Sequence, residues 1–184
     1  IEGVSNTGTV SLLLRPRKDD PATIAQEVTE LGMNTNVVAI FNTAIKAWHV
    51  AEKVWGNELA RQRLFVGQDK MSERQRVANF QAFVANPPGN GLCGSPAIEA
   101  GIDFAASYLV IEETYADSFL QRFGRSARSG QDAIVLCYSS ALYDMLKKGK
   151  LKCAYARQEF LNLVRQTLPL KEPRNLLTGL AAYP

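Results

Sequence analysis

Short apolar runs alternate with amphipathic segments along this chain. Six runs have the length and apolar character of strands, at 9–14, 37–41, 63–66, 91–93, 108–111 and 133–137. The longer segments between them repeat apolar residues at three- and four-residue spacing, as amphipathic helices do, at 21–31, 43–55, 72–84 and 114–130. This alternation predicts an α/β fold with a mostly parallel central sheet flanked by helices.

The ends and buried faces of these helices can also be predicted. Asp20 before Pro21 is typical of a helix start, and Gly32 of a helix end. Thr114 with Asp117 three residues later resembles a capping box that opens the last helix. The side chains expected to face the core are Ala44, Ala47, Trp48, Ala51 and Trp55 in 43–55, and Val77, Phe80 and Val84 in 72–84.

Composition narrows the class of protein. The chain has 184 residues, of which 46% are hydrophobic and 21% charged, which suits a globular protein with an adequate core. No apolar run approaches the roughly 18 residues that cross a membrane, so we expect a cytoplasmic protein without a membrane partner. The three cysteines form no metal-binding pair, and we interpret them as reduced thiols; His49 is the only histidine, so no metal site is predicted.

Basic residues gather towards the end of the chain. Between Met145 and Arg174 they outnumber acidic residues by eight to two, although the formal net charge of the chain is only +3. A run of this kind is commonly a solvated helix face, and it can also follow a phosphate backbone. We predict one globular domain over 1–145 and a basic helical extension over 146–184.

The segment from Gln121 to Arg128 carries three arginines and no acidic residue. At about 100° per residue, Gln121, Arg125 and Arg128 project within one narrow wedge. The face opposite them is apolar and consists of Ala116, Phe119, Leu120, Phe123 and Ala127. An arginine fork can grip two phosphate oxygens, so the wedge predicts an anion site, with a solvated basic face as the alternative.

Small polar residues follow three of the predicted strands, where ligands gather in parallel α/β sheets. Backbone amides and short side chains at such junctions can approach phosphate oxygens. The three junctions are Asn42-Thr43, Gly67-Gln68 and Gly94-Ser95. In a fourth segment, Gly101 precedes Asp103, whose carboxylate could accept a hydrogen bond from a ribose hydroxyl, or the pair could form a simple turn.

Four segments in this order resemble the second RecA-like domain of superfamily 2 helicases, from Val37 to about Tyr138. Residues 37–43 are similar to motif IV, and Gly67 with Arg74 resembles the segment that follows it. Ser95 to Asp103 is similar to motif V, with Ser95 where threonine is commoner. Gln121 to Arg128 fits the pattern of motif VI. The resemblance implies a RecA-like three-layer domain.

The resemblance also implies roles for these residues. Arg125 and Arg128 would reach the phosphates of ATP, with Arg128 as the arginine finger, while Gly101, Asp103 and Gln121 would serve the nucleotide site. The residues expected along a nucleic-acid backbone are Asn42, Thr43, Gly67, Gln68, Arg74 and Ser95. The strand is expected to be single-stranded DNA. The form of motifs V and VI is similar to CRISPR-associated helicases of type I systems, type I-D among them, which implies a CRISPR effector complex as partner.

The sequence contains neither a Gly-x-x-x-x-Gly-Lys-Ser/Thr loop nor an Asp-Glu box. We therefore expect ATP and Mg²⁺ to be held mainly by an N-terminal RecA-like domain that precedes Ile1 in the same polypeptide, and the isolated chain to be inactive. The alternatives are a non-catalytic RecA-like module that binds nucleic acid or protein, an RNA helicase C-terminal domain, and a small-molecule α/β enzyme.

Overall fold

A computed structural model describes residues 9–17, 19–32, 37–67, 70–85, 91–99, 108–124, 132–149 and 154–170. Its strands are β1 (Thr9–Arg15), β2 (Val37–Ile40), β3 (Leu64–Phe65), β4 (Gly91–Gly94), β5 (Tyr108–Glu112), β6 (Ala133–Tyr138) and β7 (Ala154–Ala156). Its helices are α1 (Pro21–Gly32), α2 (Ala44–Gln62), α3 (Glu73–Ala85), α4 (Ala116–Phe123), α5 (Ser140–Lys147) and α6 (Arg157–Thr167), and a short 3₁₀ helix, η1, spans Pro96–Glu99. All six predicted strands are present.

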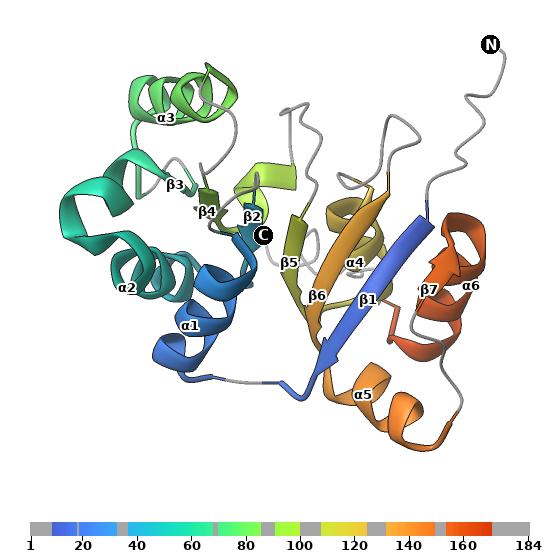
Figure 1. The fold of residues 1–184 in the computed structure, drawn as a ribbon. Coiled ribbons are helices and arrows are strands. Elements are labelled where there is room, and N and C mark those ends of the chain that lie inside the picture. The colour runs from blue at the N-terminus through green and yellow to red at the C-terminus, as the bar shows by residue number, and fades with distance from the viewer. Residues whose placement is uncertain are drawn as a thin grey trace, which may run out of the picture.

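The strands form a single sheet in the order β3-β4-β2-β5-β6-β1-β7 (Figure 1). Each neighbouring pair from β3 to β1 is parallel, and β7 adds to the edge antiparallel to β1, with Tyr155 opposite Val10. The predicted mostly parallel α/β sheet is therefore confirmed. The sequence analysis missed β7, because three residues give too short a pattern to distinguish from a loop.

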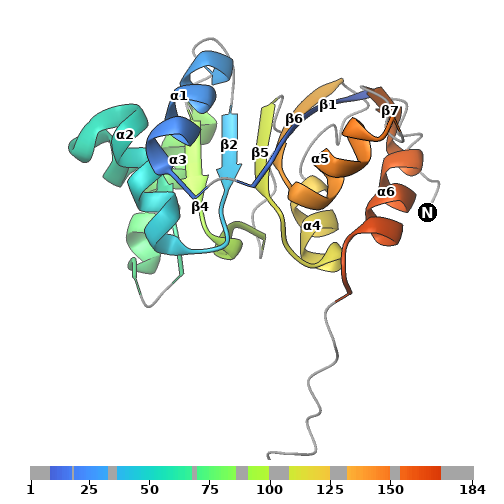
Figure 2. The same ribbon diagram turned by 90° about the horizontal axis from the view of Figure 1, so that it is seen from below.

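Helices cover both faces of the sheet. One core cluster joins α1 and α2 to the sheet, and a second joins it to α3, α4, α5 and α6. Figures 1 and 2 show α1 and α2 on one side and α4 and α6 on the other. The buried strand residues alternate between the two clusters, since Val38 and Ile40 belong to one and Val37 and Ala39 to the other. The predicted three-layer arrangement is confirmed.

The described part of the chain beyond residue 145 shares the sheet and core of the rest. It contributes β7 to the sheet, and Phe160 of α6 packs between two phenylalanines of α4, with ring centroids 6.1 Å from Phe119 and 4.8 Å from Phe123. Val164 is fully buried beside them. The segment predicted as a helical extension thus includes a strand and a helix of this same core, while a domain boundary at residue 145 stays a prediction.

The structure confirms one of two predicted helix caps and contradicts the other. The carboxylate of Asp20 accepts hydrogen bonds from the backbone N–H of Ala22 (3.2 Å) and Thr23 (3.0 Å), so it caps α1 as expected. The capping box at Thr114 is wrong. The N-cap of α4 is Tyr115, and no side chain caps this helix start. The backbone N–H of Ala116 instead donates to the carbonyl of Pro169 (2.8 Å), which follows α6.

The predicted buried face of α3 is wrong in part, because only Phe80 of its three residues packs against the core. Val77 and Val84 are about half exposed, at 48% and 58%, whereas Asn79 and Phe83 are buried. The amide of Asn79 explains the rotation of the helix, because it donates to the backbone carbonyls of Arg61 and Leu64, both at 2.7 Å. Those hydrogen bonds satisfy carbonyls at the end of α2 and the start of β3 and fix the face that α3 turns inward.

Candidate functional site

Three of the predicted backbone-contact junctions lie on neighbouring strands. Gly67 follows β3, Ser95 follows β4 and Asn42 follows β2, and these strands are adjacent in the sheet. Backbone hydrogen bonds join their ends, from Phe41 N–H to Gly94 O (2.9 Å) and from Ser95 N–H to Phe65 O (3.1 Å). Since neighbouring strands lie about 4.8 Å apart, the three junctions form a row along the carboxyl edge. The expectation that they share one edge is confirmed.

Gly94 makes this close approach of β3 and β4 possible. A Cβ atom at this position would lie 2.3 Å from the carbonyl oxygen of Phe65 and 2.2 Å from the side chain of Ile98. The backbone oxygen cannot move away, so only glycine fits here. Ser95 follows directly and is 7% exposed, and its Oγ accepts from the N–H of Ala97 (3.4 Å) at the start of η1. Its hydroxyl is therefore directed at the protein rather than outward.

Thr43 and Asn42 have different environments although they are adjacent. Thr43 is exposed, and its hydroxyl oxygen caps α2 by accepting from Lys46 N–H (3.2 Å). A hydroxyl that accepts one bond can still donate another. Asn42 is turned inward, where its Nδ2 donates to Glu113 O (2.8 Å) and its Oδ1 accepts from Arg122 (2.8 Å). Of these two predicted contact residues, Thr43 is open to a ligand, whereas the side chain of Asn42 is hydrogen-bonded within the protein.

Arg122 is the centre of a buried polar network that the sequence analysis did not identify. Its side chain is 1% exposed, and its Nη1 donates to Asn42 Oδ1 and to the carbonyl of Glu112 (3.3 Å). The carboxylate of Glu112, itself 2% exposed, accepts from Asn42 N–H (2.9 Å) and from the ammonium of Lys46 (2.5 Å). We call Asn42, Lys46, Glu112 and Arg122 the Arg122 network.

The Arg122 network connects β2, β5 and α4 at the carboxyl edge and, through Lys46, the first turn of α2. Asn42 lies at the end of β2, Glu112 ends β5, and Arg122 lies on α4. A buried charge is costly unless hydrogen bonds and opposite charges surround it, so each of these side chains has few alternative positions. The second ion pair of Lys46, with Asp19 at 3.5 Å, extends the network towards the start of α1. The end of β2 and helix α4 are thus fixed relative to each other.

A broad cleft of about 770 Å³ opens over this network. Its lining residues come from the segments after β1, β2, β4, β5 and α6 and from helix α4. They are Arg17, Asn42, Pro96, Glu113, Thr114, Tyr115, Asp117, Ser118, Gln121, Arg122 and Pro169. The exposed Gln121 lies here, so the structure brings this predicted nucleotide-coupling residue into the same cleft as Asn42, a predicted strand-contact residue.

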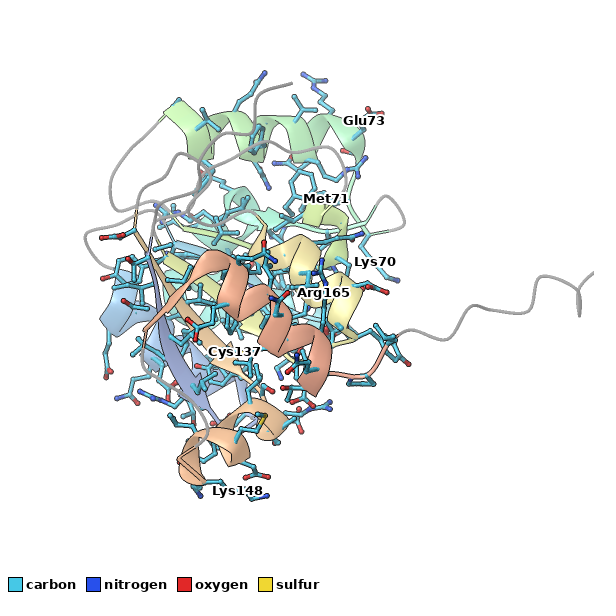
Figure 3. The ribbon with its side chains drawn as sticks, turned by 90° about the vertical axis from the view of Figure 1, so that its right-hand side faces the viewer. Lys70, Met71, Glu73, Cys137, Lys148 and Arg165 are labelled. Atoms are coloured by element: carbon cyan, nitrogen blue, oxygen red, sulfur yellow. The ribbon has the colours of Figure 1, made fainter. Side chains whose placement is uncertain are left out.

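The remaining predicted residues are either exposed or outside the described part of the chain. Arg74 is exposed in the first turn of α3, after the turn in which the carbonyl of Gly67 accepts from the N–H of Lys70 and Met71, both at 3.0 Å (Figure 3). Arg76 is more enclosed than Arg74, lying 5.8 Å over the ring of Phe65. The predicted residues that lie outside the described part are Gln68, Gly101, Asp103, Arg125 and Arg128.

Within the described residues, no group of three or more histidine, cysteine, aspartate or glutamate side chains could hold a metal ion. No helix of that part of the chain is long and apolar enough to cross a membrane. Cys93 and Cys137 are free and buried, and burial raises the pKa of both thiols, so they stay protonated at neutral pH. Neither thiol is suited to act as a nucleophile.

Solved structures of similar shape identify this architecture. A CRISPR-associated protein matches 96% of this chain at a TM-score of 0.64 and 14% identity, and Cas3 of T. fusca with AMPPNP matches 88% at a TM-score of 0.63 and 17% identity. The C-terminal domain of the DEAD-box protein Dbp5 matches 88% at a TM-score of 0.57 and 13% identity. The chain therefore shares its fold with these proteins, including the C-terminal domain of the DEAD-box protein Dbp5.

The extent of these matches differs between the two kinds of helicase. The chain spans about a quarter of the CRISPR-associated protein and of Cas3, 24% in each, but the match covers 99% of the Dbp5 domain. The sequence matches no protein-family model, and no curated protein matches it. The likeness to these proteins is therefore one of fold, carried by the arrangement of strands and helices.

Proposed function

We propose that this helicase domain is the C-terminal motor domain of an ATP-dependent helicase or translocase that acts on single-stranded DNA. The observation that carries the proposal is the row of Gly67, Ser95 and Asn42-Thr43 along one edge of a helicase-like sheet. The half-buried backbone at Gly67 and the exposed hydroxyl of Thr43 suit contacts with a phosphate backbone, which are blind to base sequence. The basic end of the chain supports the same class of ligand.

Arg125 and Arg128 would act on the nucleotide in this proposal. A guanidinium that stabilises charge on a transferring phosphoryl group is worth about 10³ to 10⁵ in rate. Both arginines follow directly after α4, whose position relative to β2 is set by the Arg122 network. The network would thereby connect the strand contacts at Asn42-Thr43 to α4, the helix that precedes the two arginines in the sequence. Gln121 lies on the face of α4 that lines the cleft.

ATP with Mg²⁺ would supply the phosphoryl group, held mainly by a second RecA-like domain of the same polypeptide. Gly101 and Asp103 would contact the nucleotide from this side. No lysine or aspartate of this chain occupies a Walker A or Walker B motif, which supports the division of labour between two domains. The chain on its own is expected to be inactive as an ATPase.

The similarity to a CRISPR-associated protein and to Cas3 supports a place in CRISPR interference, with an effector complex as partner. An RNA helicase C-terminal domain is the second candidate, and the shared fold with the C-terminal domain of the DEAD-box protein Dbp5 is compatible with it. A non-catalytic module is the third, and it leaves the arginines that follow α4 without a purpose. The match to the helicase MrfA, whose structure is bound to DNA, favours DNA.

The experiment is ATP turnover by the complete polypeptide with single-stranded DNA, comparing the Arg128→Ala variant with the unchanged protein. Turnover should fall at least about 10³-fold while ATP binding is retained, because the arginine acts on the transition state. Arg61→Ala is the matched control, since Arg61 is exposed in the last turn of α2 and does not line the cleft. Unchanged turnover in Arg128→Ala would favour the non-catalytic module.

A further inference from the structure

Tyr115 is the most exposed aromatic residue in the cleft. Its side chain is 47% exposed, although it lies between the end of β5 and the first turn of α4. Exposed single apolar residues are common on proteins and need no explanation by themselves. Tyr115 differs from the other exposed apolar residues of the described part because it lines the cleft beside Asn42 and Gln121.

The local structure gives no reason for a tyrosine at this position. Tyr115 is the N-cap of α4, where serine, threonine, aspartate and asparagine are preferred because their side chains can accept from the first N–H groups. The hydroxyl of Tyr115 makes no such hydrogen bond. Thr114, a residue type that could cap the helix, lies one residue before the N-cap position. Residues that break a local rule without a structural gain commonly serve a function.

The order of the strands places Tyr115 in line with the strand contacts. Along the carboxyl edge the junctions follow the sequence Gly67 after β3, Ser95 after β4, Asn42 after β2 and then the segment after β5 that contains Tyr115. The hydrogen bond from Asn42 Nδ2 to the carbonyl of Glu113 (2.8 Å) joins the last two junctions. A nucleic-acid strand that continues past Asn42 by one strand spacing therefore meets the cleft.

The chemistry of the cleft suits a nucleobase at this point. The aromatic face of Tyr115 can stack on any base, since every base has a π face. The amide of Gln121 and the hydroxyl of Ser118 offer both donors and acceptors to base edges. Arg17 also lines the cleft, and its guanidinium could bind a phosphate of the same strand. The volume of about 770 Å³ is of the size that binding sites for small ligands have.

We propose that Tyr115 is a stacking platform for a nucleobase of the single strand that follows the carboxyl edge. The inference rests on the proposed function, because it requires that strand. It adds a contact to the bases themselves, whereas Gly67 and Thr43 would contact the backbone. The preference would be for unpaired bases of any identity, since stacking does not read hydrogen-bond patterns.

Binding of two oligonucleotides to the complete polypeptide tests this inference. One is a dT oligonucleotide of twelve nucleotides, and the other has the same phosphates with abasic sites in place of every base. Fluorescence anisotropy should show that Tyr115→Ala weakens binding of the dT strand roughly 5- to 100-fold and leaves binding of the abasic strand unchanged. Tyr115→Phe, which keeps the ring, should bind both strands as the unchanged protein does.

Ile45→Ala is the control, because Ile45 is 69% exposed and does not line the cleft; it should change neither affinity. Equal losses on both oligonucleotides in Tyr115→Ala would overturn the stacking role. No loss on either would overturn it too and assign the ring to a protein contact. If the unchanged protein binds neither strand, both the proposed function and the inference fail. That result differs from the two above, in which the unchanged protein binds and only the stacking role fails.

Discussion

Two regions of opposite chemistry hold α4 in place. On one side the Arg122 network connects the helix to Asn42 and Glu112 through hydrogen bonds of 2.8 and 3.3 Å. On the other side, Phe160 of α6 packs against Phe119 and Phe123. Apolar packing is non-directional and allows many arrangements, whereas hydrogen bonds from a planar guanidinium require one geometry. We infer that the phenylalanines stabilise the fold and the network sets the position of α4.

The largest effect on stability should come from the aromatic side. Phe160→Ala removes a fully buried ring and leaves a cavity between α4 and α6, so the free energy of unfolding should fall by about 3 to 5 kcal/mol. Urea denaturation measures this change. Phe160→Leu keeps much of the apolar volume and should lose distinctly less. A loss below about 1 kcal/mol in Phe160→Ala would show that α6 does not support α4.

Arg122→Met should distinguish the effect of the position of α4 on turnover from the effect of the stability of the fold. Methionine keeps the apolar stem but donates no hydrogen bond, so Asn42 Oδ1 loses its donor and the free energy of unfolding should fall by about 1.5 to 3 kcal/mol. DNA-stimulated ATP turnover of the complete polypeptide should fall more in this variant than in Phe160→Ala, measured where both are folded. Equal turnover in the two variants would remove the distinction between the two regions.

A smaller effect is expected on the face of the sheet opposite α4. Tyr138 is buried on the face covered by α1 and α2, and its phenol donates to Glu27 Oε2 at 2.7 Å. Tyr138→Phe should lower the free energy of unfolding by about 1 kcal/mol at pH 7 and leave ATP turnover unchanged. Urea titrations and turnover assays of the same preparation measure both quantities. Altered turnover in Tyr138→Phe would mean that any loss of stability affects activity. The difference between the Arg122 network and the phenylalanine packing could then not be measured by turnover.

The pH dependence of stability provides a further test of Tyr138. Burial, together with the hydrogen bond to Glu27 and its charge, raises the pKa of this phenol above its ordinary value. A raised pKa in the folded protein means that the stabilising contribution is complete below the ordinary value of about 10 and is lost as the pH rises above it. Stability of the unchanged protein should therefore fall more steeply above pH 10 than that of Tyr138→Phe.

The fold could be predicted from the sequence where periodicity reflects burial in the sheet. The six parallel strands follow from their apolar runs, and the buried Ala116, Phe119 and Phe123 of α4 follow from its strong amphipathic pattern. The same reasoning failed for α3, where a polar side chain, Asn79, is buried because two backbone carbonyls need its donors. Apolar periodicity contains no information about that kind of requirement.

The candidate site was predictable in part. Residues after strand ends could be assigned to one edge because parallel strands present their carboxyl ends together. Arg122 was not identified, since its neighbours Gln121 and Arg125 suggested a single exposed polar face and its partner Asn42 lies 80 residues away. One available signal was its place beside Phe123, because side chains one residue apart on a helix differ by only about 100° and both can turn inward.

The central claim is that a nucleic-acid backbone follows the carboxyl edge of the sheet, and Thr43 offers the most direct measurement. Thr43→Asp and Thr43→Asn both keep a good cap for α2, so they should fold alike, but only aspartate places a negative charge at the exposed position. Affinity for a single-stranded oligonucleotide is measured by anisotropy at low salt. We predict that Thr43→Asp binds about fivefold or more weakly than Thr43→Asn, because a phosphate would lie close to the new charge. Equal affinities of the two variants would contradict the account.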